Sequence, residues 1–205
     1  MIETPLDKTE LRLAVPRGSL FGPTLDLLEE VGFAIGELRA NDRRLVFEVA
    51  EGRTIITTRP ADVPAYVEYG AADVGIVGRD VLLEHKRNLY ELLDLGYGRC
   101  RIVYATREGH DPEKDELKHL GEMRIASKYP NITRRYFDGL GRQVEVIDLR
   151  GSIELAPQVD LAEGIVDLTA TGETLRQNNL VERAEIAECT VRLVANRVSF
   201  KLKAD

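Results

Sequence analysis

The sequence is poor in the residues that build metal and disulfide sites. Its two cysteines, Cys100 and Cys189, lie far apart and form no Cys-x-x-Cys motif, so neither a zinc knuckle nor a disulfide scaffold is predicted. We expect reduced thiols, as in cytosolic proteins. The three histidines, His85, His110 and His119, form no i,i+4 pair with one another. We therefore predict no metal site built by the protein alone.

Long apolar runs and an excess of positive charge are also missing. No segment approaches the roughly 18 apolar residues of a membrane span. Residues 1–10 contain charged side chains and no apolar core, which argues against a secretory signal. Lys and Arg number 28 against 35 Asp and Glu, a net charge of −7, which excludes a broadly basic nucleic-acid or membrane binder. The composition, 43% hydrophobic and 31% charged over 205 residues, predicts a soluble, cytoplasmic protein of one domain or two small ones.

Strand and helix patterns alternate along most of the chain. In the first half we predict strands at 11–15, 45–49, 55–57 and 73–78, and helices at 21–31, 61–69 and 80–84. Further on we predict strands at 100–105, 124–126, 143–147, 165–169 and 185–194, and helices at 113–120, 131–139, 152–162 and 173–179. Such alternation indicates parallel sheets with helices on both faces. The sequence therefore predicts an α/β protein.

The break at Gly96-Tyr97-Gly98 suggests a division into two similar lobes. We assign residues 1–98 plus 183–205 to the first lobe and 99–182 to the second, with the last strand returning to the first lobe. Two lobes of this size account for the whole length better than one long sheet.

The most informative stretch is Asp167-Leu-Thr-Ala-Thr-Gly-Glu-Thr174. An apolar strand ends in an acidic residue, and a Thr-Gly-x-Thr turn then leads into a helix. Such a turn suits a phosphate, because Gly172 permits close approach of the backbone and the amides of the helix start point at one anion. Thr171 and Thr174 add hydroxyl groups, and Asp167 and Glu163 suit ribose hydroxyls or a magnesium–pyrophosphate unit. The alternative is an ordinary strand-to-helix turn with a threonine cap.

Two arginines follow predicted strands at the edge where open α/β sheets bind ligands. Arg17, in Pro16-Arg17-Gly18, offers a fork of donors to a phosphate, and Arg59 follows the strand at 55–57. Solvent-facing arginines in turns are the alternative.

Three further motifs are weaker. The predicted strand that contains Asp73 and Gly75 has two interpretations. Its glycines allow either close packing of a helix against the strand or close approach of the backbone to an adenine or sugar. Lys128 follows another predicted strand. It either brings a cation to a ligand-binding cleft or belongs to an ordinary turn that is capped by Asn131. Glu154, after Arg150-Gly-Ser, is either a partner of the helix dipole or a ligand contact.

Taken in order, these segments resemble the ATP phosphoribosyltransferase family, which catalyses the first step of histidine biosynthesis. The match covers nearly the whole chain and rests on Leu11-Arg-Leu-Ala-Val-Pro-Arg-Gly-Ser, Arg59 through Gly78, Leu93-Asp-Leu-Gly, Ala126-Ser-Lys-Tyr-Pro-Asn, Gly151-Ser-Ile-Glu-Leu-Ala-Pro and Asp167 through Leu175. The resemblance implies two Rossmann-like lobes of the periplasmic-binding-protein type II kind, with the active site in the cleft between them.

The resemblance also implies roles for the candidate residues. Phosphoribosyl pyrophosphate would bind in the second lobe, at Glu163, Asp167, Thr169, Ala170, Thr171, Gly172, Glu173 and Thr174. ATP would bind on the side of the first lobe, at Arg17, Gly18, Asp73 and Gly75, together with Glu154. Arg17 and Arg59 would serve catalysis beside the polyphosphates. Many members have a basic residue where this chain has Ser19, so its role would fall to Arg17, Arg59 or another arginine.

The implied reaction joins the phosphoribosyl group to N1 of ATP and releases pyrophosphate with Mg²⁺. Short members of the family act with a regulatory subunit resembling histidyl-tRNA synthetase, and this chain resembles them. We therefore expect a homodimer within a hetero-oligomer, and little sensitivity of the isolated chain to histidine. Two alternatives stay open: a non-catalytic two-lobed module that binds a small ligand, and a phosphoribosyltransferase that acts on another base.

Overall fold

The computed structural model describes residues 10–40, 43–110 and 122–203. The chain divides into two compact units. Unit 1 contains Met1–Leu82, Lys86–Gly98 and Thr190–Asp205, and unit 2 contains Leu83–His85 and Arg99–Cys189. Apart from Leu83–His85, the chain enters unit 2 after Gly98 and leaves it after Cys189, later than the return expected after residue 182. The helix expected at 113–120 lies outside the described residues.

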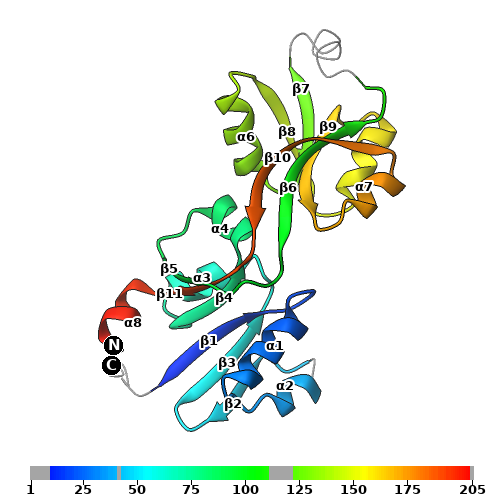
Figure 1. Ribbon diagram of the computed structural model, residues 1–205. Helices are drawn as coiled ribbons and strands as arrows, with labels where there is room; N and C mark the ends of the chain where they lie inside the picture. The colour runs from blue at the N-terminus through cyan, green and yellow to red at the C-terminus, as the bar shows by residue number, and fades with distance from the viewer. Residues whose placement is uncertain (1–9, 41–42, 111–121, 204–205) are drawn as a thin grey trace. The chain divides into compact units, whose positions relative to one another are not determined.

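Unit 1 is built on a six-stranded sheet in the order β2-β3-β1-β4-β11-β5 (Figure 1). Its strands are β1 (Leu11–Pro16), β2 (Val46–Ala50), β3 (Arg53–Thr58), β4 (Val74–Gly78), β5 (Tyr90–Asp94) and β11 (Val191–Ala195). β1 pairs parallel with β3 and β4, whereas β2–β3, β4–β11 and β11–β5 are antiparallel. The sheet is therefore mixed rather than parallel as predicted. One reason is the short connection between β2 and β3, which permits a hairpin but no crossover.

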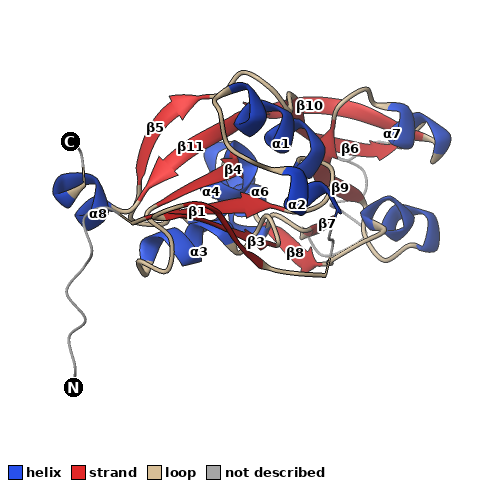
Figure 2. Cartoon of the chain, turned by 90° about the horizontal axis from the view of Figure 1, so that it is seen from below, coloured by secondary structure: helices blue, strands red, loops and turns tan. Residues whose placement is uncertain are grey.

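Helices cover both faces of this sheet. α1 (Phe21–Glu30) and α2 (Gly36–Ala40) pack with Leu13 and Val15 of β1 on one face. α3 (Val63–Glu68) and α4 (Arg79–His85) pack with Ala14 on the other, and Figure 2 shows α1 and α3 on opposite sides of the strands. Successive side chains of a strand point to opposite faces, so one apolar run supplies both layers.

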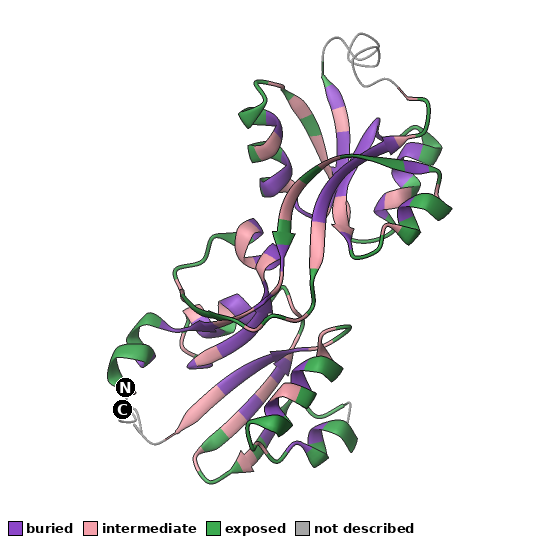
Figure 3. Cartoon of the chain, viewed as in Figure 1, coloured by how far each residue is buried: buried purple, intermediate pink, exposed green. Residues whose placement is uncertain are grey.

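Unit 2 has a five-stranded sheet in the order β10-β6-β9-β7-β8. Its strands are β6 (Cys100–Arg107), β7 (Met123–Ser127), β8 (Val144–Asp148), β9 (Gly164–Thr169) and β10 (Leu180–Cys189). β9, β7 and β8 run parallel, and β6 runs antiparallel to both β9 and β10. α6 (Pro130–Gly139) covers one face, and the 3₁₀ helix η2 (Ile153–Val159) and α7 (Glu173–Gln177) cover the other. The middles of β6, β7 and β9 are buried between these layers (Figure 3).

Two predicted elements differ from the structure. The strand expected at 185–194 is two strands, β10 and β11, which are separated at Thr190 and belong to different sheets. Because β10 pairs with β6 as far as Cys189, the chain returns to unit 1 late. The helix expected at 152–162 is the shorter η2, which has Pro157 inside it and left-handed residues, Ser152 and Asp160, at its ends. Proline lacks the amide that an α-helix interior requires.

Three short elements were not predicted: α2, β5 and α8 (Arg197–Leu202). Each has five or six residues, too few for a periodic pattern to stand out. Among the described residues, no helix is long and apolar enough to cross a membrane.

Candidate functional site

The loop between β9 and α7 is held in shape by its own threonines. The hydroxyl of Thr169 accepts a hydrogen bond from the amide of Gly172 at 2.8 Å, and the hydroxyl of Thr171 accepts one from the amide of Glu173 at 3.3 Å. Gly172 has a φ of +75°, which glycine adopts without the strain that a Cβ would add. Two of the threonines predicted as substrate contacts, Thr169 and Thr171, thus also shape the turn.

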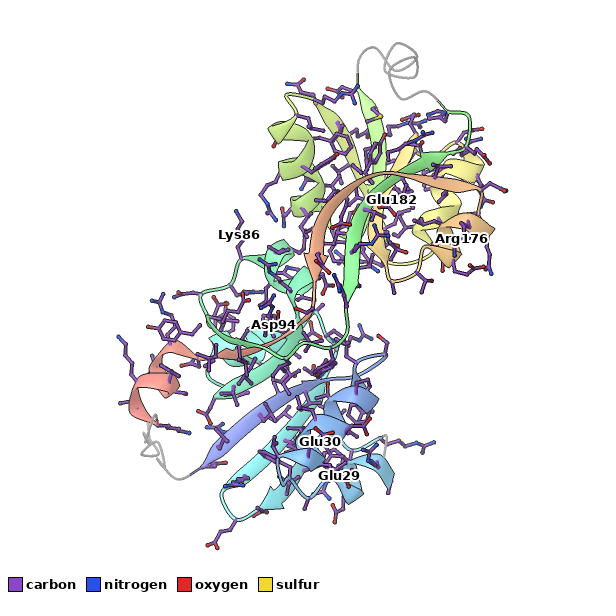
Figure 4. All side chains as sticks on the ribbon, in the orientation of Figure 1. Glu29, Glu30, Lys86, Asp94, Arg176 and Glu182 are labelled. Carbon is purple, nitrogen blue, oxygen red and sulfur yellow. The ribbon has the colours of Figure 1, made fainter. Side chains whose placement is uncertain are left out.

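The first turn of α7 is fixed by charged and polar side chains. Arg176, which is labelled in Figure 4, donates a hydrogen bond to the Glu173 carboxylate at 2.7 Å. It donates another to the carbonyl of Thr171 at 3.3 Å. The hydrogen bond from Arg176, followed by the one from Gln177, lowers the pKa of Glu173 below its ordinary value. The exposed Glu173 is therefore an anion that already has a cationic partner.

A lysine lies beside the acidic residue at the end of β9. The Lys128 Nζ is 2.9 Å from Oδ1 of Asp167, and this oxygen also accepts a hydrogen bond from the amide of Leu168 at 2.7 Å. Ser127 braces the same place, because its hydroxyl donates to the carbonyl of Val166 at 2.6 Å and accepts from the amide of Tyr129. Both strands, β7 and β9, are parallel neighbours, so their carboxyl ends meet.

Glu163 does not join this group. It immediately precedes β9, so it stands about 13 Å along the strand from Asp167 at roughly 3.3 Å per residue. Glu163 is buried, and its carboxylate accepts hydrogen bonds from the Arg124 guanidinium at 2.6 Å and from the Arg124 amide at 2.6 Å. Arg124 and Glu163 thus form a structural ion pair at the opposite edge of the sheet, and the structure does not bring Glu163, predicted together with Asp167 as a contact of the ribose, to the Asp167 carboxylate.

The structure does bring Arg17 and Arg59 to one edge of the unit 1 sheet. β1 and β3 are parallel, and their last residues, Pro16 and Thr58, are partners in register. The two arginines come next in the chain, so they leave the sheet side by side. Arg59 is exposed and precedes α3.

Arg17 is already engaged with its surroundings. Its Nε donates to the hydroxyl of Thr57 at 2.9 Å, and its terminal nitrogen donates to the carbonyl of Arg44 at 2.6 Å. The guanidinium also lies over the ring of Phe21, 5.8 Å from its centroid. Arg17 therefore organises this edge of the sheet, whatever it does for a ligand.

The other residues predicted to bind ATP in unit 1 lie in different parts of its sheet. Gly18, in the turn after β1, has a φ of +86° and is exposed. Asp73 stands at the opposite edge, before β4, where its buried carboxylate pairs with Lys203 at 3.0 Å. A Cβ on Gly75 would lie 2.7 Å from Val67 and 2.9 Å from Val63, so this glycine is required by the packing of α3 on β4. Asp73 and Gly75 thus have structural roles, and the structure does not bring the Asp73 carboxylate to the edge that holds Arg17 and Arg59.

In unit 2, Glu154 is half-buried in the first turn of η2. The expected cap at Asn131 is replaced by another residue: the Glu84 carboxylate accepts hydrogen bonds from the amides of Asn131 at 2.9 Å and Ile132 at 3.0 Å. Glu84 belongs to the three residues of α4 that group with unit 2. No local signal marks such a cap, because its acceptor comes from a distant part of the chain.

The described residues offer few side chains that could coordinate a metal ion. Within the described ranges, no group of three or more His, Cys, Asp and Glu side chains is arranged to hold a metal ion. A single carboxylate such as Asp167 still fits Mg²⁺ that arrives on substrate phosphates, because Mg²⁺ is commonly held by one or two carboxylates together with phosphate oxygens.

Comparison with known proteins gives one consistent family. The family model described as ATP phosphoribosyltransferase matches residues 59–205. The chain is 53% identical to the ATP phosphoribosyltransferase of Rubrobacter xylanophilus over 94% of its own length and 89% of the relative's. It is 50% identical to that of Geobacter metallireducens, over 94% and 91%.

Solved structures extend the comparison to the fold. The chain superposes with a TM-score of 0.81 and 36% identity on a chain of the ATP phosphoribosyl transferase (HisG:HisZ) complex from Thermotoga maritima, covering 95% of this chain and 91% of that one. It also matches the periplasmic aliphatic sulphonate binding protein SsuA of Escherichia coli, with a TM-score of 0.58 and 13% identity over 94% and 63% of the two chains. The predicted α/β fold of the periplasmic-binding-protein kind is thereby confirmed.

Proposed function

The chain belongs to the ATP phosphoribosyltransferase family, and from this premise we propose which of its residues hold the two substrates. It catalyses the first step of histidine biosynthesis: the phosphoribosyl group of phosphoribosyl pyrophosphate passes to N1 of ATP, giving phosphoribosyl-ATP and pyrophosphate.

Phosphoribosyl pyrophosphate binds at the loop from Thr169 to Thr174. The single observation that carries this proposal is the shape of the loop, in which Gly172 is left-handed and two threonine hydroxyls hold the turn. A turn at the start of a helix collects backbone amides around one anion. Ala170, Thr171 and Glu173 line the same exposed turn, which suits the 5-phosphate.

Asp167 and Lys128 bind the ribose and pyrophosphate part of this substrate. The carboxylate of Asp167 accepts hydrogen bonds from ribose hydroxyls, and Lys128, at 2.9 Å from it, supplies positive charge for the phosphates. Mg²⁺ bound with the pyrophosphate neutralises part of the charge of this leaving group. Glu163 is not included, because its carboxylate is committed to Arg124.

ATP binds beside Arg17, Gly18 and Arg59 at the carboxyl edge of β1 and β3. Two arginines that follow neighbouring parallel strands form a local cationic site in a protein of net charge −7. The exposed Arg59 acts on the polyphosphates directly, and Arg17 both shapes the edge and contributes charge. Glu154 remains a candidate ATP contact, whereas Asp73 and Gly75 are left out.

The reaction needs no nucleophilic side chain of the protein, because N1 of ATP itself attacks the anomeric carbon. Both substrates are strongly anionic, so the protein must reduce their repulsion and align them. Positioning and electrostatic stabilisation are therefore the main contributions of these residues.

The substrate assignment is tested with the purified full chain, by following formation of phosphoribosyl-ATP by its ultraviolet absorbance. Product should form with ATP, phosphoribosyl pyrophosphate and Mg²⁺, and should fail to form when any of the three is omitted. Product from phosphoribosyl pyrophosphate and a free base, with none from ATP, would contradict the proposal.

We also propose a protein partner. The Thermotoga maritima relative was solved as a HisG:HisZ complex, and this chain covers 91% of that relative's chain at 36% identity. We infer that this chain assembles with a regulatory subunit like HisZ. Co-expression with the HisZ of the same organism, followed by size-exclusion chromatography and histidine-inhibition assays, should give one complex that histidine inhibits. Separate elution of the two chains would contradict this proposal.

A further inference from the structure

The two cysteines of the chain face each other across two strands. Cys100 is the first residue of β6 and Cys189 is the last residue of β10, and they are partners in the antiparallel register. Directly opposite residues of an antiparallel pair have Cα atoms about 4.5 or 5.5 Å apart, depending on their hydrogen bonding. Disulfides form at Cα separations of about 4.4–6.8 Å. Both kinds of pairing fall within this Cα range, and the non-hydrogen-bonded kind also brings the Cβ atoms to about 4.5 Å, the upper end of the roughly 3.5–4.5 Å that a disulfide needs.

The side chains lie on the same face of the sheet. Cys189 is 1% exposed and belongs to the apolar cluster that contains Tyr104 and Phe137, and Cys100 packs against the same cluster. Cys100 is only half-buried. A small reagent can thus reach the sulfur of Cys100 first, with the sulfur of Cys189 behind it as the second reactant.

The two cysteines lie near the two ends of the segment that builds most of unit 2, so a disulfide between them would close that segment into a loop. Apart from Leu83–His85, unit 2 is one continuous segment, which the chain enters between Gly98 and Arg99 and leaves between Cys189 and Thr190. One cysteine stands just after the first passage and the other just before the second, and β6 and β10 lie side by side along their length (Figure 1). A bond here would join the two ends of the segment that builds most of unit 2.

We propose that Cys100 and Cys189 form a reversible disulfide when the chain meets a low-molecular-weight disulfide such as oxidised glutathione. The thiolate of Cys100 attacks one glutathione sulfur and releases the first glutathione thiolate, which leaves a mixed disulfide. The thiolate of Cys189 then attacks Sγ of Cys100 and releases the second. The protein loses two electrons and two protons, and oxidised glutathione gains both as two reduced molecules.

The expected consequence is a stability that depends on the thiol redox state. A disulfide that closes a long loop restricts the unfolded chain, and the loop from residue 100 to 189 contains nearly all of unit 2. The oxidised chain should therefore unfold at a temperature several degrees higher than the reduced chain. The partial exposure of Cys100 keeps the bond open to reduction.

The test uses the folded full chain at low concentration, equilibrated with mixtures of reduced and oxidised glutathione and then alkylated. We expect an intact mass lower by two hydrogen atoms and, after non-reducing proteolysis, one peptide pair linking Cys100 to Cys189. Dithiothreitol should restore the reduced mass and the lower unfolding temperature. This chemistry does not depend on the assigned substrates, so it can fail while phosphoribosyl-ATP is still formed.

Two variants make the result specific. Cys189→Ala should stop at the glutathione adduct of Cys100, and Cys100→Ser should gain neither the adduct nor the link, each with circular dichroism showing a folded chain. The proposal is overturned if the folded wild-type chain yields only the adduct, only links between molecules, or a link that appears only in denaturant.

Discussion

At the scale of single residues, side chains of the same type differ in the contacts that they make within the folded protein. Arg17 and Arg59 follow neighbouring strands, yet Arg17 donates hydrogen bonds to Thr57 and to the carbonyl of Arg44, whereas Arg59 is exposed. Removing Arg17 would disturb the fold and the chemistry together. Arg59 and Lys128 are therefore the better probes of the proposed site.

Arg59→Ala should lower kcat by about 10²–10³-fold, the loss typical of removing one preorganised donor to developing charge. The KM for ATP should change less, because the arginine acts mainly in the transition state. Initial rates at varied ATP measure both quantities. Arg53→Ala, at the start of β3, the strand that Arg59 follows, is the control and should retain kcat. An unchanged kcat with only a raised KM would contradict the role of Arg59.

Lys128→Gln removes the cation beside Asp167. A hydrogen bond to a charged group contributes about 1.5–3 kcal/mol, so kcat/KM for phosphoribosyl pyrophosphate should fall by about 10–100-fold. The exposed Arg134 provides the control Arg134→Gln, which makes the same change of charge on α6. Equal kcat/KM values for Lys128→Gln and the control would exclude Lys128 from the substrate site.

At the scale of elements, close packing of a helix on a strand explains Gly75, which was predicted from the sequence to contact ATP. Gly75 lies in β4 where α3 crosses it, and Val63 and Val67 of α3 occupy the space of a side chain. Thr171 of the β9–α7 loop has both kinds of role, because its hydroxyl shapes the loop and the residue stays at the exposed surface. An element can thus require a residue for packing, for a ligand, or for both.

Gly75→Ala should destabilise the protein by about 1–3 kcal/mol through overpacking, while the KM for ATP in the protein that remains folded stays unchanged. Urea unfolding measures the first effect and initial rates the second. Gly139→Ala, on α6, is a matched control because a Cβ there meets no heavy atom within 4 Å, and it should be neutral or stabilising. A specific rise in KM for ATP without loss of stability would restore Gly75 to the substrate site.

At the scale of the whole molecule, the C-terminal helix is fastened to the start of the unit 1 sheet. Lys203, just after α8, pairs with the buried Asp73 at 3.0 Å, and the amide of Arg12 in β1 donates to the same carboxylate at 2.9 Å. Asn196 caps α8 through the amides of Val198 and Ser199. These contacts join residues from both ends of the described chain into one unit.

This ion pair predicts an acid-dependent loss of stability. Burial raises the pKa of Asp73, but hydrogen bonds from Ser199, the Arg12 amide and Lys203 outweigh it, so the pKa lies below its ordinary value of 3.8. A carboxyl with a lowered pKa stabilises the fold fully above its ordinary pKa and loses this contribution as the pH falls below it. Asp73 should therefore contribute at neutral pH and cease to contribute in strong acid.

Asp73→Asn tests this dependence. At pH 7 the variant should be less stable by about 3 kcal/mol, because it leaves the Lys203 ammonium, whose side chain is 8% exposed, without its anionic partner. The difference from wild type should shrink as the pH falls below about 4. Urea unfolding across pH measures it, with Asp138→Asn on the exposed face of α6 as the control. A difference independent of pH would rule out the ionised carboxylate as its source.

Features that depend on neighbouring residues could be predicted from the amino-acid sequence. Strand and helix periodicity identified most elements, and the order of the motifs identified the family. The Thr-Gly-x-Thr turn was predictable because its shape comes from residues three apart, such as Thr169 and Gly172. Glycine conformation and short-range hydrogen bonds act within a few residues, so a local pattern suffices.

Contacts between residues far apart in the chain became known from the three-dimensional fold. Strand order and register place Arg17 beside Arg59, Lys128 beside Asp167, and Cys100 opposite Cys189. The fold also pairs the carboxylate of Glu163 with Arg124 and that of Asp73 with Lys203. From their sequence context, both carboxylates were predicted to bind a substrate. Strand pairing joins residues far apart in the chain and is set by burial of the whole sheet, so no local pattern contains it.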